Sequence, residues 1–546
     1  MGAYLNSGSP YKKYHAVVTD SYFVDKTCFI CEFFEALGKE RRYFCITRPR
    51  RFGKTVMANM MAAYFCRAID SSQIFNKLKI ASCAGYLKHL NSHDVIFIDF
   101  SRTPQNCRSF RQYIERIQNG IKNDLEEMYP ECKGGGDEAV WDILGEICRK
   151  RGRAFIFIMD EWDAVFHVPY FTREDQKEYL LFLKNLLKDQ DYVELAYMTG
   201  ILPIAKYSGG SELNMFAEYQ MTAKERFGSY FGFSEEETDR LYAEYRKRNP
   251  NGSITREALA WWYDGYCTAD GTKIYNPRSV VQALSDSQLG NYWTGSGPYG
   301  EIFYYIRGNA AKVRDDLAYM MSGGRVEAGI QEYAATSKEL RTKDQIYSAM
   351  VVYGLLAYEN GEVFIPNKEL MDKYKELLMA DEELGYVHAL AKESARMLKA
   401  TLAGDTETMQ QILKYAHDTE SPISAYSSEA ELAAVVNLVY LAARDKYRVE
   451  REDKAGEGYV DFIFYPQRRE DDGIILELKT DSTPLKALQQ IKDRNYILRF
   501  EGKLGERPKY TGRILGAGIS YDRKTKEHFC RVEVLRRKIT DAGSGD

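Results

Sequence analysis

The chain has 546 residues, of which 45% are hydrophobic and 28% charged, and its formal net charge is −4. This length predicts about two to four domains with ample core, and the composition is that of an ordinary soluble globular protein. The balanced charge does not indicate a nucleic-acid-binding protein, and it does not exclude one that has local basic patches.

Three features of the sequence concern its location. No apolar run is long enough to cross a bilayer, and residues 1–10 lack the pattern of a secretory signal. The ten cysteines form no disulfide framework, which is typical of a reducing cytosol. Cys28 and Cys31 form C-x-x-C in a predicted helix over 27–37, without a second pair to complete a zinc or redox site. We therefore expect a cytoplasmic protein with no membrane partner.

The stretch Tyr22–Thr27 comes directly before this helix. Asp25 or Thr27 can cap the helix, because both side chains carry an oxygen that accepts a backbone N–H. A contact with a nucleotide base is the alternative that the sequence leaves open.

The clearest motif lies between a predicted strand at residues 43–46 and a predicted amphipathic helix. Residues 48–55 read Arg-Pro-Arg-Arg-Phe-Gly-Lys-Thr. The end Gly53-Lys54-Thr55 fits a phosphate loop, in which backbone N–H groups and the helix N-terminus cradle phosphate. Lys54 would reach the outer phosphates and Thr55 would offer its hydroxyl to Mg²⁺.

Arg48 stands where the usual phosphate-loop motif has its first glycine. One alternative is therefore a strand–turn–helix joint in which Gly-Lys-Thr occurs by chance. Another is that Arg48 and Arg50 disfavour turnover and leave a tight ATP binder. We expect Arg50 and Arg51 to take part in nucleotide binding, either by acting on phosphate in cis or by anchoring the loop.

Two acids follow a strongly apolar stretch and form the second half of a nucleotide site. Residues 154–159 predict a buried central strand that ends at Asp160 and Glu161. Ligands of open α/β sheets lie outside the carboxyl ends of the strands, where the phosphate loop also lies. Asp160 would hold the Mg²⁺ shell and Glu161 would polarise the attacking water. The alternative is a strand end with two solvated acids. A similar strand ending at Asp99 lacks a second acid, and we discount it.

A further strand is predicted at Val193–Gly200. Thr199 at its end could sense the γ-phosphate, or its hydroxyl could simply cap the strand. The alternation of strands and helices from 43 to 202 predicts a doubly wound, mostly parallel sheet of the P-loop NTPase class. Beyond about residue 230 the pattern is helical, and a helix plus hairpin over 344–367 predicts a winged-helix-like lid.

Two strands near the C-terminus carry a second set of charged residues. They are predicted over 457–465 and 473–480, and a hairpin centred near residue 469 would place Asp461 opposite Glu477. The period of two puts Lys479 on the same face as Glu477. Two carboxylates and a lysine suit metal-dependent phosphodiester hydrolysis. Charged residues of this kind can also form a solvated face.

Several neighbours could complete this second site. Glu431, on a preceding helix, could be an extra metal ligand or base, and Gln490 lies on a predicted helix over 484–498. Basic residues that could line a phosphate path, or be solvated surface, are Arg444, Lys446, Arg448, Lys492, Arg494 and Lys509.

The motifs together resemble one family, the bacterial and archaeal AAA-like ATPases with a C-terminal PD-(D/E)XK nuclease domain. The matching stretches are 22–27, 48–55, 160–161, 198–201, 262–266 and 275–279. The resemblance implies ATP and Mg²⁺ as cofactors, a phosphate loop that normally begins with arginine, and a restriction-endonuclease-like α/β core. It also implies that Asp461, Glu477, Lys479 and Gln490 form the nuclease motif, where Mn²⁺ could replace Mg²⁺.

We expect an ATPase domain at 1–233, a helical, winged-helix-like region at 234–370 and a nuclease-like domain at 371–546. The leading hypothesis is an ATPase whose nucleotide state gates a metal-dependent DNA nuclease. The alternative is an ATP-driven switch whose C-terminal fold only binds nucleic acid or a protein partner. DNA is the expected macromolecular partner, and a homo-oligomer is compatible with the sequence.

Overall fold

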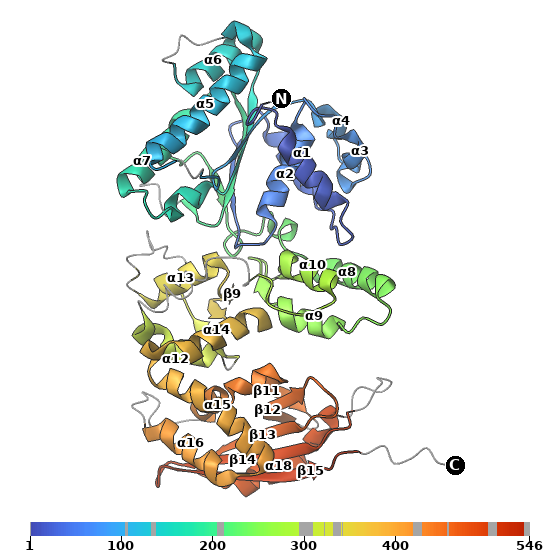
Figure 1. The fold of residues 1–546 in the computed structure, drawn as a ribbon, viewed down its shortest axis with the longest axis vertical. Helices are drawn as coiled ribbons and strands as arrows, with labels where there is room; N and C mark the ends of the chain where they lie inside the picture. Colours follow the sequence, from blue (N-terminus) through green and yellow to red (C-terminus); the bar gives the residue numbers. More distant parts are fainter. Residues whose placement is uncertain are drawn as a thin grey trace, which may run out of the picture. The chain divides into compact units, whose positions relative to one another are not determined.

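The computed structural model describes most of the chain (Figure 1). It forms two compact units, which we describe separately: Met1–Pro298 with Ala328–Glu369, and Tyr299–Glu327 with Leu370–Asp546. Among the described residues, no helix has both the length and the apolar character needed to cross a bilayer. The described residues are 2–103, 107–132, 138–204, 212–293, 309–321, 323–330, 340, 342–418, 429–455, 458–500 and 510–539.

A five-stranded sheet forms the centre of the first unit, with the strand order β2-β3-β4-β1-β5. Every pairing within it is parallel. The inner strands β1 and β3 are buried along their whole length, and β4 is buried except at Glu194, because helices cover both faces. The predicted doubly wound, parallel sheet is therefore confirmed. Its strands are β1 (Tyr43–Thr47), β2 (Asp94–Asp99), β3 (Phe155–Asp160), β4 (Val193–Gly200) and β5 (Ala217–Tyr219).

Alternate residues of the strands supply two separate apolar cores. Phe155 and Phe157 of β3 pack with the helices α5, α6 and α7, whereas Ile156 and Ile158 pack with α2 and the segment before β1. Figure 1 shows these two helical layers on opposite sides of the sheet. The helices are α1 (Gly8–Val18), α2 (Lys54–Phe65), α3 (Ser72–Phe75), α4 (Tyr86–His89), α5 (Phe110–Met128), α6 (Val140–Arg151) and α7 (Arg173–Leu187).

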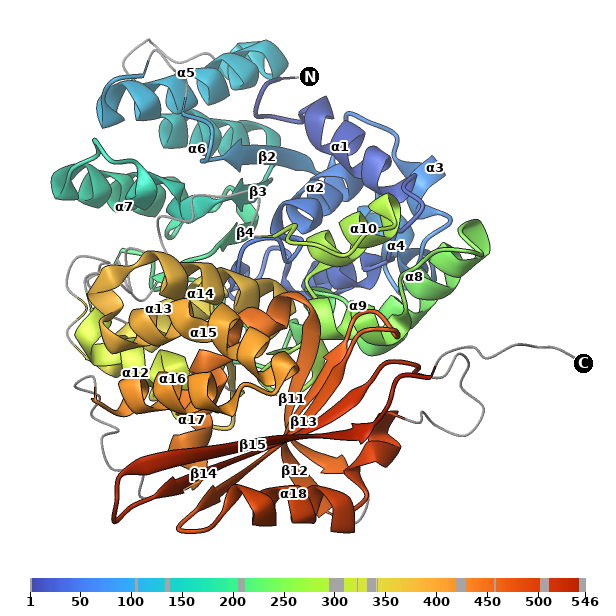
Figure 2. The same ribbon diagram turned by 60° about the horizontal axis from the view of Figure 1, so that its bottom comes forward.

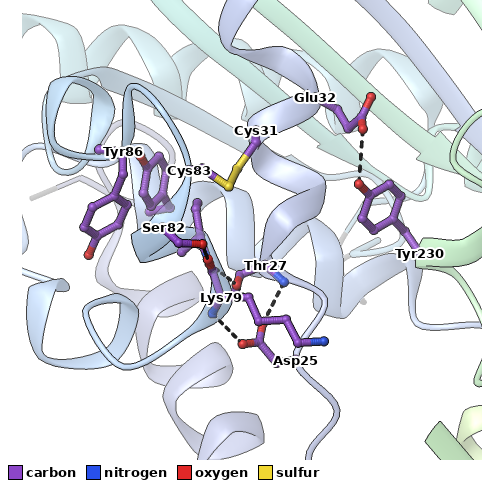
Figure 3. The surroundings of a disulfide bond; sticks show 11 residues. Asp25, Thr27, Cys31, Glu32, Lys79, Ser82, Cys83, Tyr86 and Tyr230 are labelled. Atoms are coloured by element: carbon purple, nitrogen blue, oxygen red, sulfur yellow. Dashed lines mark hydrogen bonds between the residues drawn. A yellow bond between two sulfur atoms is a disulfide. The ribbon is translucent and has the colours of Figure 1, made fainter. Parts of the chain in front are cut away.

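The segment predicted as a helix over 27–37 is a 3₁₀ helix, η1 (Thr27–Ala36). Three of its four buried residues, Thr27, Ile30 and Phe33, are spaced by three, which suits the three residues per turn of this helix, and Phe29 is the fourth. The carboxylate of Asp25 accepts hydrogen bonds from the backbone N and hydroxyl of Thr27 and from Lys79 N, at 2.9, 2.6 and 2.7 Å (Figure 3). Asp25, which precedes the N-cap residue Lys26, thus accepts the N–H of the first residue of η1.

A disulfide joins Cys31 to Cys83 beside this cap (Figure 3). The spacing of the cysteines did not predict this bond. Cys31 and Cys83 are 52 residues apart, and only the fold brings them together. Cys28, the other half of the C-x-x-C motif, is a free thiol.

The rest of the first unit is helical with short hairpins. The helix α8 begins with a capping box formed by Ser234 and Glu237. The predicted hairpin is present and turns at Asn360 and Gly361, which both have positive φ. The elements are α8 (Glu235–Arg248), α9 (Arg256–Tyr263), β6 (Tyr266–Cys267), β7 (Lys273–Ile274), α10 (Pro277–Asp286), α13 (Lys343–Tyr353), β9 (Ala357–Glu359) and β10 (Glu362–Phe364).

A second five-stranded sheet, in the order β11-β12-β13-β14-β15, forms the second unit. Only β13 and β14 pair in parallel in this described sheet, and α18 connects them. Figure 2 shows α18 lying along one face. The strands are β11 (Tyr447–Ala455), β12 (Gly458–Pro466), β13 (Gly473–Thr480), β14 (Ile514–Asp522) and β15 (Glu527–Arg536).

Two details of this unit differ from the sequence analysis. The strand β11 was missed, and the helix predicted over 484–498 ends at Asp493 because Asn495 takes a positive φ of 51°. The helices are α12 (Ala310–Met321), α14 (Lys368–Ala380), α15 (Tyr386–Ala403), α16 (Thr406–Asp418), α17 (Glu429–Val439) and α18 (Pro484–Asp493).

The disulfide makes a testable difference to stability. Cys31 and Cys83 are separated by 52 residues, and a cross-link of that span restricts the unfolded chain by about 4 kcal/mol. We expect Cys83→Ser to lower the free energy of unfolding by up to this amount. A reductant should lower it equally in the wild type and should have no effect on the variant, which lacks the bond. Thiol titration of the denatured, unreduced protein should find eight free cysteines. A count equal to all ten would contradict the bond.

Candidate functional sites

The phosphate loop connects β1 to α2 through two residues in the left-handed region. Arg51 has φ 69° and Gly53 has φ 89°, and Gly53 is the residue that precedes the first turn of α2. Glycine adopts this conformation without steric cost. The Lys54 ammonium is buried and donates to the carbonyl of Pro49 at 3.0 Å. The turn thus places Lys54 inside its own loop, at the N-terminus of α2.

Arg48 explains why the chain departs from the usual motif. Its guanidinium is buried and donates to the carbonyls of Thr47, Tyr219 and Phe227 at 2.8, 2.9 and 3.3 Å. It also lies over the ring of Phe231, 4.8 Å from the centroid. Burial lowers the pKa of Arg48 to about 10. Arg48 therefore fastens the start of the loop to β5 and to the segment after it.

Three residues distant in sequence hold the outer side of the loop. The indole N–H of Trp293 donates to the carbonyl of Arg50 at 2.9 Å. The ring of Tyr266 meets Phe52 edge-on, with centroids 5.0 Å apart, and its hydroxyl donates to the Gly354 carbonyl at 2.8 Å. These contacts anchor the loop through the Arg50 carbonyl and the Phe52 ring, and the roles expected for the side chains of Arg50 and Arg51 stay predictions. Sequence reasoning missed Trp293 and Gly354, because neither stands in a pattern of its own.

Asp160 and Glu161 end β3 as predicted and lie beside the phosphate loop. Burial raises the pKa of Asp160 to about 7, and the charge of Glu161 adds to the rise. A hydrogen bond from Thr55 and the charge of Lys54 act in the opposite direction. Four predicted residues from two distant stretches are thus brought together.

Thr199 ends the neighbouring strand β4, and its hydroxyl is already engaged. It donates to the carbonyl of Ile46 at 2.9 Å, and the side chain is fully buried. This is the strand-capping bond that the sequence analysis kept as an alternative to a γ-phosphate sensor. Asp99, at the end of β2, accepts from Arg102 at 2.9 Å.

The second site lies on the paired strands β12 and β13. Phe462 pairs with Leu476, so the predicted register is confirmed and Asp461 stands opposite Glu477. The Asp461 carboxylate accepts from Leu478 N at 2.7 Å. Glu477 Oε1 accepts from Lys479 Nζ at 3.2 Å and from the amide of Gln490. All four predicted residues therefore converge.

Glu477 is 2% exposed, and among the described residues its second oxygen, Oε2, meets no hydrogen-bond donor. Burial raises its pKa to about 7, the charge of Asp461 adds to the rise, and Lys479 acts against it. Burial also raises the pKa of Asp461, against a hydrogen bond from Leu478 and the charge of Lys479. A buried, unpaired carboxylate oxygen is costly unless a proton or a cation satisfies it.

Glu431 lies in α17, but its side chain is outside the described residues, so its predicted role as a ligand stays a prediction. Within the part of the chain that is described, no group of three or more His, Cys, Asp or Glu side chains is arranged to hold a metal. The site as described therefore offers a metal two carboxylates, those of Asp461 and Glu477.

The expected phosphate path is wrong for Arg444. Its guanidinium is buried and donates to Met321 O at 3.0 Å and to Asn437 Oδ1 at 2.8 Å, so it faces the interior of the second unit. Arg448 and Lys492 form ion pairs with the nearby residues Glu450 and Glu533, at 3.0 and 2.7 Å. Lys509 lies outside the described residues.

Two parts of the chain match known protein families. Residues 12–208 match the family described as Predicted AAA-ATPase, and residues 427–521 match the PD-(D/E)XK nuclease superfamily. A protein of Azotobacter chroococcum, described as uncharacterized and located in the vnfD 5′ region, is 22% identical over 501 residues, which are 89% of this chain and 91% of that protein.

Two solved structures are similar at a low level. A Walker-type ATPase of Pyrococcus abyssi has a TM-score of 0.34 and 12% identity, over 64% of this chain and 94% of its own. The ORC2 protein of Aeropyrum pernix has a TM-score of 0.30 and 10% identity, over 69% and 96%. Both TM-scores are too low to support an assignment of the fold or function. The domain assignment rests on the two family matches. The chain therefore carries a predicted AAA-ATPase domain in its N-terminal part and a PD-(D/E)XK nuclease superfamily domain near its C-terminus.

Proposed function

We propose that this chain hydrolyses ATP at the phosphate loop and cleaves DNA at the C-terminal site, with nucleotide state controlling cleavage. One observation carries the proposal: each unit holds a buried carboxylate with a raised pKa beside a lysine, at the positions the two motifs require. Such perturbed acids concentrate at catalytic sites.

The residues of the first site fit a nucleotide with Mg²⁺. Apart from its chain neighbours, no described atom lies within 4 Å of where a Cβ of Gly53 would stand, so the loop is open there. Thr55 and Asp160 are oxygen donors, which Mg²⁺ prefers, and they would hold it. Bound Mg²⁺ would supply charge neutralisation on the phosphates. Lys54 would exchange the Pro49 carbonyl for phosphate, and Glu161 would orient the attacking water.

The residues of the second site fit a divalent cation for the same reason. Glu477 Oε2 is a buried acceptor without a donor in the described structure, and Asp461 stands opposite it. These two carboxylates would hold Mg²⁺ or Mn²⁺, which when bound would activate water and stabilise the charge of the pentacoordinate phosphate. Lys479 would neutralise the scissile phosphate, and Gln490 orients the Glu477 carboxylate through its amide.

The ATPase half is tested by two substitutions. We expect Lys54→Ala to abolish nucleotide binding and turnover, because it removes the cation that meets the phosphates. Glu161→Gln should retain binding but lower phosphate release by about a hundredfold or more, since the base is lost. Phosphate release and binding of a fluorescent ATP analogue measure the two effects. Unchanged release from Glu161→Gln would remove this residue from the mechanism.

The nuclease half is tested on plasmid and single-stranded DNA with Mg²⁺ or Mn²⁺, with and without ATP. We expect Glu477→Ala to abolish cleavage, and Gln490→Ala to weaken metal affinity by about 10- to 100-fold because the carboxylate loses its support. Asp481→Asn is the matched control, since Asp481 lies just beyond β13 and pairs with Arg523 on the surface. Equal, metal-independent behaviour of wild type and Glu477→Ala would reject the nuclease half.

Metal binding at the second site should depend steeply on pH. The pKa of Glu477 is raised to about 7, and the cation competes with the proton on this carboxylate. Affinity for Mn²⁺ should therefore fall about tenfold for each pH unit below this value and level off above it. Isothermal titration with Mn²⁺ from pH 5.5 to 8 measures this. An affinity independent of pH across that range would show that Glu477 is not the titrating ligand.

A further inference from the structure

A buried acid that neither the motif nor the proposed mechanism uses connects the ends of β3 and β4. Asp163 lies in the short 3₁₀ helix η4 (Trp162–His167), directly after Glu161. It is 1% exposed. Its Oδ2 accepts hydrogen bonds from the backbone N–H groups of Ile201 and Leu202, at 3.1 and 2.9 Å. These are the first two residues after β4, so one carboxylate fastens the exit of β4 to the turn after β3.

Two further bonds strengthen this connection. The indole N–H of Trp162 donates to the carbonyl of Leu202 at 3.0 Å, and the hydroxyl of Tyr179 on α7 donates to the carbonyl of Trp162 at 2.7 Å. Gly200 permits the close approach, because a Cβ there would lie 2.3 Å from Asp163 Oδ1 and 2.5 Å from the Trp162 ring. The two strand exits are therefore packed together without room for a larger side chain.

Asp163 keeps its charge although it is buried. Burial by itself raises its pKa, but the neighbouring imidazole of His167, the N–H of Leu202 and the charge of Lys54 hold the pKa below the ordinary value. His167 Nε2 lies 3.7 Å from Asp163 Oδ2. In the described structure Asp163 Oδ1 has no hydrogen-bond partner. A fixed negative charge thus stands among the ends of β3, β4 and the phosphate loop.

Glu161 depends on this support because its backbone is strained. It has φ 51° and ψ 47°, a left-handed conformation that costs a residue other than glycine about 1 kcal/mol or more. The turn around it is closed by the bonds from Glu161 N to Asp160 Oδ1, at 3.1 Å, and from Ala164 N to the Glu161 carbonyl, at 2.9 Å. Asp163 lies between these two closures and fastens the turn to β4.

We propose that Asp163 is a positioning residue for ATP hydrolysis: by tying the exit of β4 to the strained turn, it fixes where Glu161 stands relative to the phosphate loop. This inference rests on the proposed ATPase function and adds a residue to it. Asp163 touches neither nucleotide nor water in this scheme. Its removal should slow hydrolysis and leave nucleotide binding, which belongs to Lys54 and the loop, unchanged.

The test is Asp163→Asn in the full chain. The side chain keeps its size, but its oxygen becomes a neutral acceptor, which binds the N–H groups of Ile201 and Leu202 about half as strongly. An NH₂ group replaces the other oxygen, so the tie between β4 and the turn is weakened. We expect kcat for ATP to fall about 10- to 100-fold, as small misplacements of a catalytic group do. KM, the Kd of a fluorescent ATP analogue and the number of sites that bind it should stay within about twofold of the wild type, as for an interaction used only in the transition state.

The matched control is Asp124→Asn. Asp124 also accepts backbone N–H groups, those of residues 3, 4 and 5, but it anchors the N-terminal segment to α5. Its substitution should leave kcat unchanged. A wild-type kcat in Asp163→Asn would overturn the inference, whereas a parallel loss of kcat and binding sites marks a folding defect. If Asp163→Asn does not fold, Trp162→Phe decides: it removes one bond to Leu202 and should lower kcat alone.

The rate of ATP turnover by the wild type distinguishes a failure of this inference from a failure of the proposed ATPase function. Absence of turnover in the wild type would refute the proposed ATPase and the inference with it. Turnover in the wild type that is lost in Glu161→Gln, but is intact in both Asp163→Asn and Trp162→Phe, would refute the inference alone.

Discussion

Both candidate sites depend on the same constraint, a carboxylate that is held out of water beside a lysine. Asp160 is 1% exposed and Glu477 is 2% exposed, and burial is the largest reason for the raised pKa of each. A folded chain tolerates such groups only where hydrogen bonds and opposite charges offset the loss of hydration. The surrounding elements supply those partners: Thr55 and Lys54 in one unit, Lys479 and Gln490 in the other.

The phosphate loop is held by groups that do not face a phosphate. Arg48 holds the start of the loop by its hydrogen bond to the Tyr219 carbonyl. Trp293 bonds the Arg50 carbonyl, and the ring of Tyr266 packs against Phe52. Pro49 packs so closely that a Cβ on Gly354 would lie 2.7 Å from it. Such preorganisation lowers the entropic cost of gathering N–H groups around an anion. Arg48, the first arginine of the motif, therefore has a structural role, because its guanidinium donates hydrogen bonds to backbone carbonyl groups.

Sequence patterns predicted the elements on which the sites stand, because those elements are set by local periodicity. Apolar runs predicted β3 and β4, and the pairing of Asp461 with Glu477 followed from the position of one hairpin turn. The same reasoning failed where a tertiary contact decides. The helix predicted over 27–37 is a 3₁₀ helix in the structure. The buried side chain of Arg444 donates to two carbonyl oxygens, that of the Met321 backbone and that of the Asn437 side chain. The disulfide from Cys31 to Cys83 crosses 52 residues without any local signal.

The sequence by itself determined the two kinds of site, since motif spacing and strand period place Lys54, Asp160, Asp461 and Glu477 without reference to distant residues. Only the tertiary structure decided how these groups are supported: which carbonyls bind Arg48, what Thr199 bonds to, and that Asp163 joins β3 to β4. The physical reason is that each of these contacts joins segments far apart in the chain or uses a backbone group that every residue carries. Patterns of side chains can be read from the sequence. The partners of backbone N–H and C=O groups depend on how distant segments pack, because nearly every residue carries the same two groups.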